Sequence, residues 1–187
     1  MSKSKKQKFG SNGKKEALKG LKFLAAWLLA FAVLYYGAIA VFGWNGIEGF
    51  TAAGAEKILN SFTPSKTSVD FNAEPVVLNV EGKQILISEL CTGLLETALL
   101  AAAIIASIGI EWRKRIFGAI AAIAFGMAFN QLRIFASIMQ ILNTDLEFAE
   151  LTHDLFFRLS LLIVIAGFYY LWFRKAAKGR LTKTRED

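Results

Sequence analysis

The chain has 187 residues, 55% of them apolar, and a formal net charge of +7. The apolar residues gather in four blocks, each close to the roughly 20 residues that cross about 30 Å of hydrocarbon, which excludes an ordinary soluble domain. With one Cys and one His, the chain cannot form an internal disulfide or an ordinary structural zinc site, which takes about four N or S ligands. The pattern predicts a multi-pass membrane protein.

The first segment, 1–20, is a basic tail that we expect to lack regular structure. Together with Lys22 it holds eight lysines. Beside a membrane span, such a tail is better explained by topology and by attraction to anionic lipids than by nucleic-acid binding. Membrane lipids are therefore expected partners, and nucleic acid is not.

The first predicted span covers 21–42, and its length favours a retained span over a cleaved signal peptide. It is followed by 43–89, which contains both prolines and a mixture of polar and apolar residues that could not rest in lipid. We expect this segment to form a small cap outside the bilayer. Helical apolar spacing over 47–62 predicts a surface helix, and apolar runs at 76–80 and 83–87 around Glu81-Gly82 predict a β-hairpin.

The last part, 90–173, is predicted to form a three-span core with spans at 90–110, 116–142 and 155–173, followed by a second basic tail at 174–187. Most of the 22 basic residues lie in the two tails and in the turn at 111–115. Positive segments stay in the cytoplasm, so both termini are predicted inside and the cap outside. The fold class expected is an all-α integral membrane protein, a four-span helix bundle with a small outer cap.

Polar residues inside spans are costly and therefore informative. Counting about 1.5 Å per residue from the cytoplasmic ends places six of them in two tiers. The outer tier is Cys91, Arg133 and His153, and the tier below it is Glu96, Asn130 and Arg158.

Each of these residues has a structural interpretation beside the functional one. Cys91 alone could be an apolar filler, but at a helix N-terminus its thiolate is favoured. Arg133 could neutralise Glu96, a role compatible with catalysis.

Arg158 and His153 differ in which of the two interpretations is favoured. Arg158 stands four residues after Asp154 and is better explained as one half of a local ion pair. His153, the only His, is better explained as a base beside the only Cys.

Three ordered motifs resemble those of the exosortase and archaeosortase superfamily: Cys91-Thr92-Gly93, Asn130-Gln131-Leu132-Arg133, and His153. The resemblance covers roughly 89–173, and the Thr after the Cys is similar to the archaeal branch. Members of that superfamily are membrane cysteine transpeptidases, commonly with more than four spans. Their substrates are secreted proteins whose C-terminal signal combines a short motif, a hydrophobic span and a basic tail.

The resemblance implies a catalytic trio of Cys91, Arg133 and His153 acting at the outer face of the cell membrane. Cys91 would form a thioester, Arg133 would stabilise the oxyanion and His153 would move protons. Asn130 would orient Arg133, with Glu96 and Arg158 as further support. No metal or organic cofactor is required, and transfer to a lipid acceptor is implied only by the resemblance.

Two alternatives stay open at this point. Water could resolve the thioester, which would make the protein a peptidase. Alternatively, the polar tiers could simply join helices in a nonenzymatic assembly factor or transport subunit.

Overall fold

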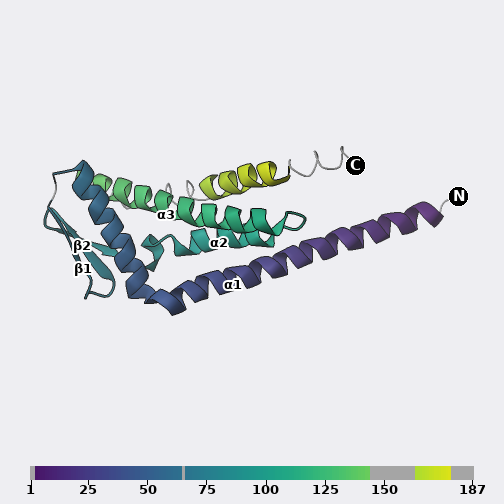
Figure 1. Cartoon of the computed structure of the whole chain (residues 1–187), viewed down its shortest axis with the longest axis horizontal. Helices are drawn as coiled ribbons and strands as arrows, with labels where there is room; N and C mark the ends of the chain where they lie inside the picture. Colours follow the sequence, from purple (N-terminus) through teal and green to yellow (C-terminus); the bar gives the residue numbers. More distant parts are fainter. Residues whose placement is uncertain (1–2, 65, 144–162, 178–187) are drawn as a thin grey trace.

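The computed structural model describes residues 3–64, 66–143 and 163–177, and it is mostly helical. A long helix, α1 (Lys3–Phe62), is followed by three strands, a short 3-10 turn, and the helices α2 (Leu94–Ala106) and α3 (Trp112–Asn143). Residues 163–177 form a further helical stretch. The sheet lies at one end of the molecule, and the amino-terminal part of α1 extends toward the opposite end (Figure 1).

Helix α1 consists of two arms that meet at Gly43, where the backbone has φ 66° and ψ 164°. The predicted span 21–42 lies in the first arm, and the predicted surface helix 47–62 lies in the second. Both are therefore confirmed as helical. The expectation of an irregular basic tail is wrong, because α1 begins at Lys3. Lys, Gln and Glu are good helix formers, and they extend a helix that the apolar span has already nucleated.

The cap contains an antiparallel sheet in the order β1-β2-β3, with β1 (Thr67–Asp70), β2 (Val76–Val80) and β3 (Lys83–Ile87). The predicted hairpin is confirmed, and Val80 pairs with Lys83 across a two-residue turn. Glu81 and Gly82 have φ values of 51° and 82°, the two positive values that a type I′ turn requires. Strand β1 was not predicted, since its four residues carry only one strongly apolar side chain, Val69.

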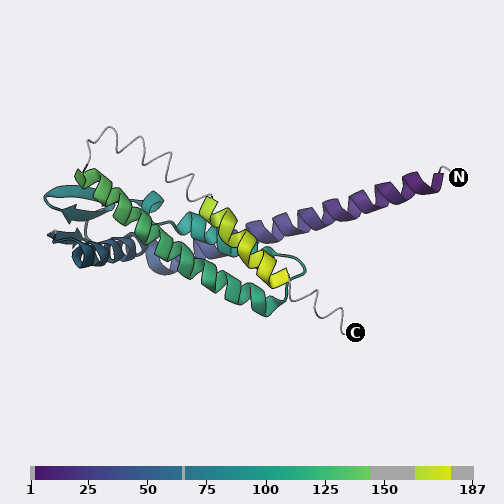
Figure 2. The ribbon, with the colours of Figure 1, turned by 90° about the horizontal axis from the view of Figure 1, so that it is seen from above.

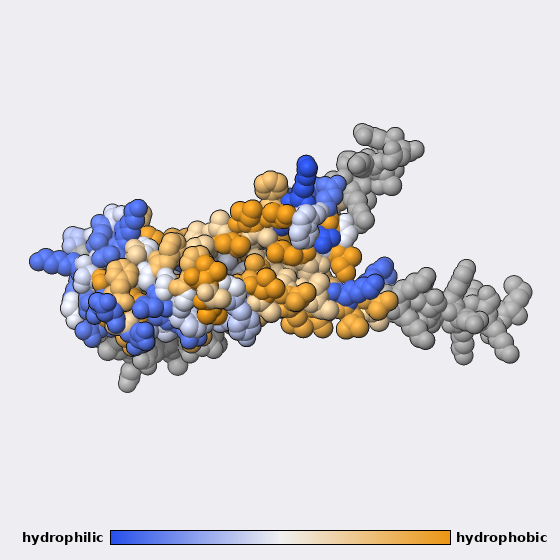
Figure 3. Space-filling model, turned by 60° about the horizontal axis from the view of Figure 1, so that its bottom comes forward, coloured by the Kyte–Doolittle hydropathy of each residue, from blue (hydrophilic) through white to orange (hydrophobic). Residues whose placement is uncertain are grey.

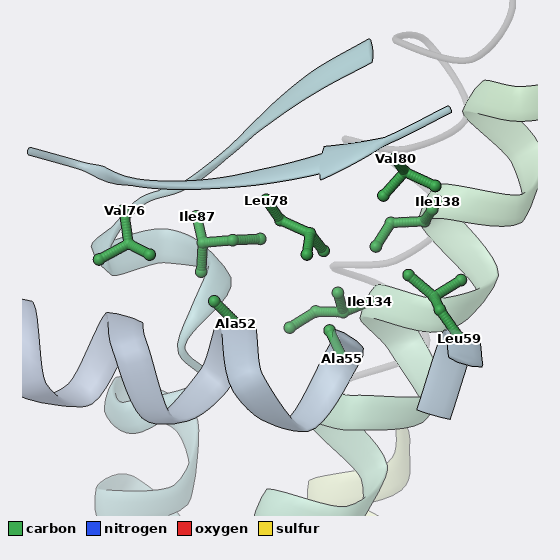
Figure 4. Packing of buried hydrophobic residues seen from close by; sticks show 9 residues of the cluster. All are labelled: Ala52, Ala55, Leu59, Val76, Leu78, Val80, Ile87, Ile134 and Ile138. Atoms are coloured by element: carbon green, nitrogen blue, oxygen red, sulfur yellow. The ribbon is translucent and has the colours of Figure 1, made fainter. Parts of the chain in front are cut away.

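One face of the sheet packs onto helices and forms the core of the cap (Figure 4). The sheet residues in this core come from β2 and β3, and the helical residues come from the second arm of α1 and the carboxyl half of α3. The cluster comprises Ala52, Ala55, Leu59, Val76, Leu78, Val80, Ile87, Ile134 and Ile138. This packing fixes the end of β3, and hence the chain leading to Cys91, against α3.

Helix α2 is shorter than the span predicted at 90–110. Its 13 residues extend about 20 Å, less than the roughly 30 Å of a hydrocarbon core. At the start, Gly93 is left-handed, and at the end Ser107 has φ −59° and ψ 107° before the left-handed Gly109. The expected bounds were wrong because hydropathy continues through these residues while the helical backbone does not.

Helices α2 and α3 and the stretch 163–177 pack closely, and glycines of α3 permit the close approach. A Cβ on Gly126 would lie 2.5 Å from Thr97 Oγ1, and one on Gly118 would overlap Trp172. Phe125 and Phe168 stack with ring centroids 4.8 Å apart. Figures 1 and 2 both show 163–177 lying along the amino-terminal half of α3.

Within the described ranges, two helical segments are long and apolar enough to cross a membrane, Glu16–Phe62 and Trp112–Asn143. They correspond to the first and third predicted spans. The fourth predicted span, 155–173, lies partly outside the described residues, so the four-span bundle stays a prediction. On the face drawn in Figure 3, apolar residues cover the helices next to the polar cap.

Candidate active site

Cys91 ends the 3-10 turn η1 (Glu89–Cys91), which directly follows β3. Its amide donates to Ser88 O at 2.8 Å, and its Sγ lies 3.8 Å from Ser88 Oγ and 3.9 Å from Leu86 O. The sequence placed Cys91 in the first turn of a helix beginning at Leu90. The structure corrects this, because α2 begins only at Leu94.

Thr92 and Gly93 make the connection from this turn into α2. The Thr92 hydroxyl donates to Glu89 O at 2.7 Å and accepts from the Leu94 amide at 3.3 Å, so it joins the turn to the first residue of the helix. Gly93 has φ 66°, and a Cβ there would lie 2.7 Å from Asn130 Cγ. Both conditions favour glycine, which gives the Cys-x-Gly spacing a physical reason.

Two side chains of α3 converge on the backbone of this turn. Asn130 Nδ2 donates to Cys91 O at 2.9 Å, and Arg133 Nη2 donates to Cys91 O at 3.3 Å and to Leu90 O at 3.1 Å. Because Sγ and O of one residue are at most about 5 Å apart, Nη2 lies within about 8 Å of the thiol. The motifs at Cys91 and at 130–133 therefore form one site.

Arg133 still has hydrogen-bond donors to offer. A guanidinium carries five N–H groups, and the contacts described for Arg133 involve only Nη2. Arg133 and Glu96 form no ion pair in the structure. The structure therefore gives no support to the interpretation of Arg133 as the counter-charge of Glu96. Among the described residues, the other N–H groups of the Arg133 guanidinium make no hydrogen bond.

Glu96 lies in the first turn of α2. Together with Gly93 and Asn130 it lines a small cavity of about 20 Å³ between α2, α3 and 163–177. His153 and Arg158 lie outside the described residues. Their predicted roles stay predictions.

A larger cavity, of about 550 Å³, borders the site where both arms of α1 face α2 and α3. Thr92 and Gly93, the two residues after Cys91, line it, and so does Asn130. Gln131 also lines it and donates to Thr51 O at 3.3 Å. Sequence reasoning treated Gln131 only as part of a motif, although a second amide inside an apolar segment was the signal available.

The fold and this site define a class of protein: a membrane protein with a single cysteine held beside an arginine and an asparagine at the junction of cap and helices. The family model for transmembrane exosortases matches residues 15–171. The chain therefore belongs to the transmembrane exosortase family, as the three motifs predicted, and membership indicates a membrane transpeptidase. No curated protein and no solved structure matches the chain.

Proposed function

We propose that the protein is a membrane cysteine transpeptidase that cleaves C-terminal sorting signals of secreted proteins at the outer face of the cell membrane. The observation that carries the proposal is the convergence of Asn130 and Arg133 on the carbonyl of Cys91. Asn130 and Arg133, about 40 positions after Cys91, hold the turn that presents the only thiol of the chain. The expected substrates end in a short motif, a hydrophobic span and a basic tail.

In the proposed reaction the Cys91 thiolate attacks the carbonyl carbon of a substrate peptide bond, and the carbonyl oxygen becomes an oxyanion. Unoccupied N–H groups of Arg133 donate to this oxyanion, a kind of contact that contributes about 3 to 4 kcal/mol in other enzymes. The C–N bond then breaks, and the leaving amine takes a proton from His153, the role we assign to this residue. A hydroxyl or amine acceptor, which we take to be a lipid, loses its proton to His153, attacks the thioester and releases the thiolate.

Two other functions have support of their own. Asn130 and Arg133 also hold the backbone of the turn at 89–91, which favours a purely structural role in a nonenzymatic assembly or transport subunit. A peptidase would have the same site, with water as the acceptor.

Replacement of Cys91 by Ala in the native host tests the proposal, with a secreted reporter carrying the tripartite signal. Loss of cleavage at normal enzyme abundance supports catalysis, whereas unchanged cleavage supports the nonenzymatic function. The mass of the reporter's new C-terminus separates transfer from hydrolysis, because hydrolysis adds only water.

A further inference from the structure

We propose that the 550 Å³ cavity beside the catalytic turn binds one hydrocarbon chain of a membrane lipid, with the polar end of that lipid at Thr92 and Asn130. One part of this inference rests on the proposed function, namely that the bound lipid is the acceptor of the transfer. The binding itself follows from the shape and lining of the cavity.

The lining is amphiphilic along its length. Polar side chains from three elements, Thr51, Thr92 and Gln131, lie toward the cap. Leu34, Ala101 and Ile123 lie at the other end, and Ile123 is two helical turns from Gln131, about 12 Å away along the axis. A ligand that matches this lining has one polar end and one apolar end.

The polar end offers an acceptor that the protein itself does not use. Asn130 is 4% exposed. A carbonyl oxygen only accepts hydrogen bonds, so the amide atom that faces Cys91 O is the donor Nδ2. Its Oδ1 is buried without a hydrogen-bond partner among the described residues, and the same holds for Gln131 Oε1. Unpaired buried acceptors are unfavourable, so a hydroxyl or amine that donates a hydrogen bond to either oxygen would be stabilised at this end.

Large apolar side chains that are themselves exposed line the cavity. Phe42 and Phe50 line it and are 67% and 60% exposed, and Met127 is also exposed. Large exposed apolar side chains around an opening are stable in contact with lipid and unfavourable in contact with water. A cavity lined in this way does not hold water but admits an acyl chain from the bilayer.

The competing occupant is the hydrophobic span of a protein substrate, and vesicles that hold no substrate test the lipid alone.

The test uses the full chain in vesicles of phosphatidylcholine and phosphatidylglycerol. The probe is a phosphatidylcholine that carries a diazirine near the end of one acyl chain. After illumination, mass spectrometry should find the label at the deep end of the cavity, around Ala101 and Ile123. Labelling confined to outward-facing residues of α1 would overturn the proposal.

Two variants fill the cavity from α1, and a third is their matched control. Ala38→Phe and Gly46→Leu should each reduce labelling several-fold; a Cβ on Gly46 meets only Phe42 Cβ, at 3.7 Å, so this variant retains its fold. Ala40→Phe places the same ring on an exposed position of α1 outside the lining and should label like wild type. Equal labelling of all three variants would contradict a chain in the cavity.

A last comparison separates this inference from the proposed function. Cys91→Ala should keep wild-type lipid labelling while losing reporter cleavage; retained cleavage would refute the proposed function and leave the labelling result intact. In the filling variants, the hydroxylamine-sensitive adduct between reporter and Cys91 should accumulate, since cleavage proceeds and transfer does not. Loss of labelling with transfer at the wild-type rate would show that the bound lipid is not the acceptor.

Discussion

At the scale of single residues, the protein holds the backbone of Cys91 and leaves its side chain lightly engaged. Three hydrogen bonds from Asn130 and Arg133 fix the carbonyls of Leu90 and Cys91. The thiol, in contrast, has only the long contacts to Ser88 and Leu86. Fixing a nucleophile through its main chain orients the sulfur without occupying it.

Cys91→Ala should therefore abolish processing while the protein remains folded. Cys91 is only partly buried, so loss of the sulfur leaves a small cavity and costs about 1 kcal/mol or less. Cys91→Ser should be equally inactive, because a hydroxyl is a far weaker nucleophile than a thiolate. Reporter cleavage and membrane abundance are measured together, and cleavage by Cys91→Ala at the wild-type rate would eliminate the covalent mechanism.

Arg133→Lys separates the oxyanion role from that of a positive charge. Lys keeps the charge but loses the planar fork, so it cannot hold both the turn and an oxyanion. We expect turnover to fall by about 10² or more while crosslinking of the reporter to the enzyme persists. Near-normal turnover would assign Arg133 to the scaffold.

Arg115→Lys is the matched control for this change. Arg115 also donates to backbone carbonyls, those of Ile110 and Ile105, but at the other end of α2. The substitution removes a comparable anchor without touching the site. It should lower thermal stability modestly and leave turnover per folded molecule unchanged.

At the scale of elements, the junction between η1 and α2 depends on Gly93. Ala at this position would be left-handed at a cost of about 1 to 2 kcal/mol, and its Cβ would also press on Asn130. Gly93→Ala should thus lower the thermal midpoint of the purified protein and displace the turn that carries Cys91. Gly37→Ala, in α1 with nothing within 4 Å of the new Cβ, should instead be neutral or slightly stabilising. Equal midpoints in the two variants would contradict the close packing at Gly93.

The elements also show what the sequence could predict. The hairpin was predictable because Glu81-Gly82 sets its turn locally, and the third span because its hydropathy persists through α3. The kink at Gly43 and the short α2 were not, since hydropathy does not distinguish a helical glycine from a left-handed one. The three motifs indicated the site residues, but the contact of Arg133 with carbonyls instead of Glu96 depends on how α3 packs against η1, a tertiary arrangement.

At the scale of the whole molecule, the face drawn in Figure 3 has a polar cap and an apolar region next to it, the division expected of a protein that lies partly in water and partly in lipid. Cys91 lies where they meet, between strand β3 of the cap and the apolar helix α2. Basic residues concentrate in the first 22 residues, at 113–115 and after residue 173, away from the cap in sequence. By the positive-inside rule, this distribution predicts that the cap and Cys91 lie outside.

A membrane-impermeant maleimide tests this orientation directly, because Cys91 is the only thiol of the chain. In intact cells the reagent should label wild type and should not label Cys91→Ala. A second reporter, Cys91→Ala combined with Ser11→Cys in the basic tail, should react only after the membrane is opened. The two thiols lie on opposite sides of the first predicted span, so the rule predicts opposite results for them. Labelling of Ser11→Cys in intact cells, with Cys91 protected until lysis, would invert the topology and move the proposed cleavage to the cytoplasmic face, where secreted substrates could no longer reach the thiol.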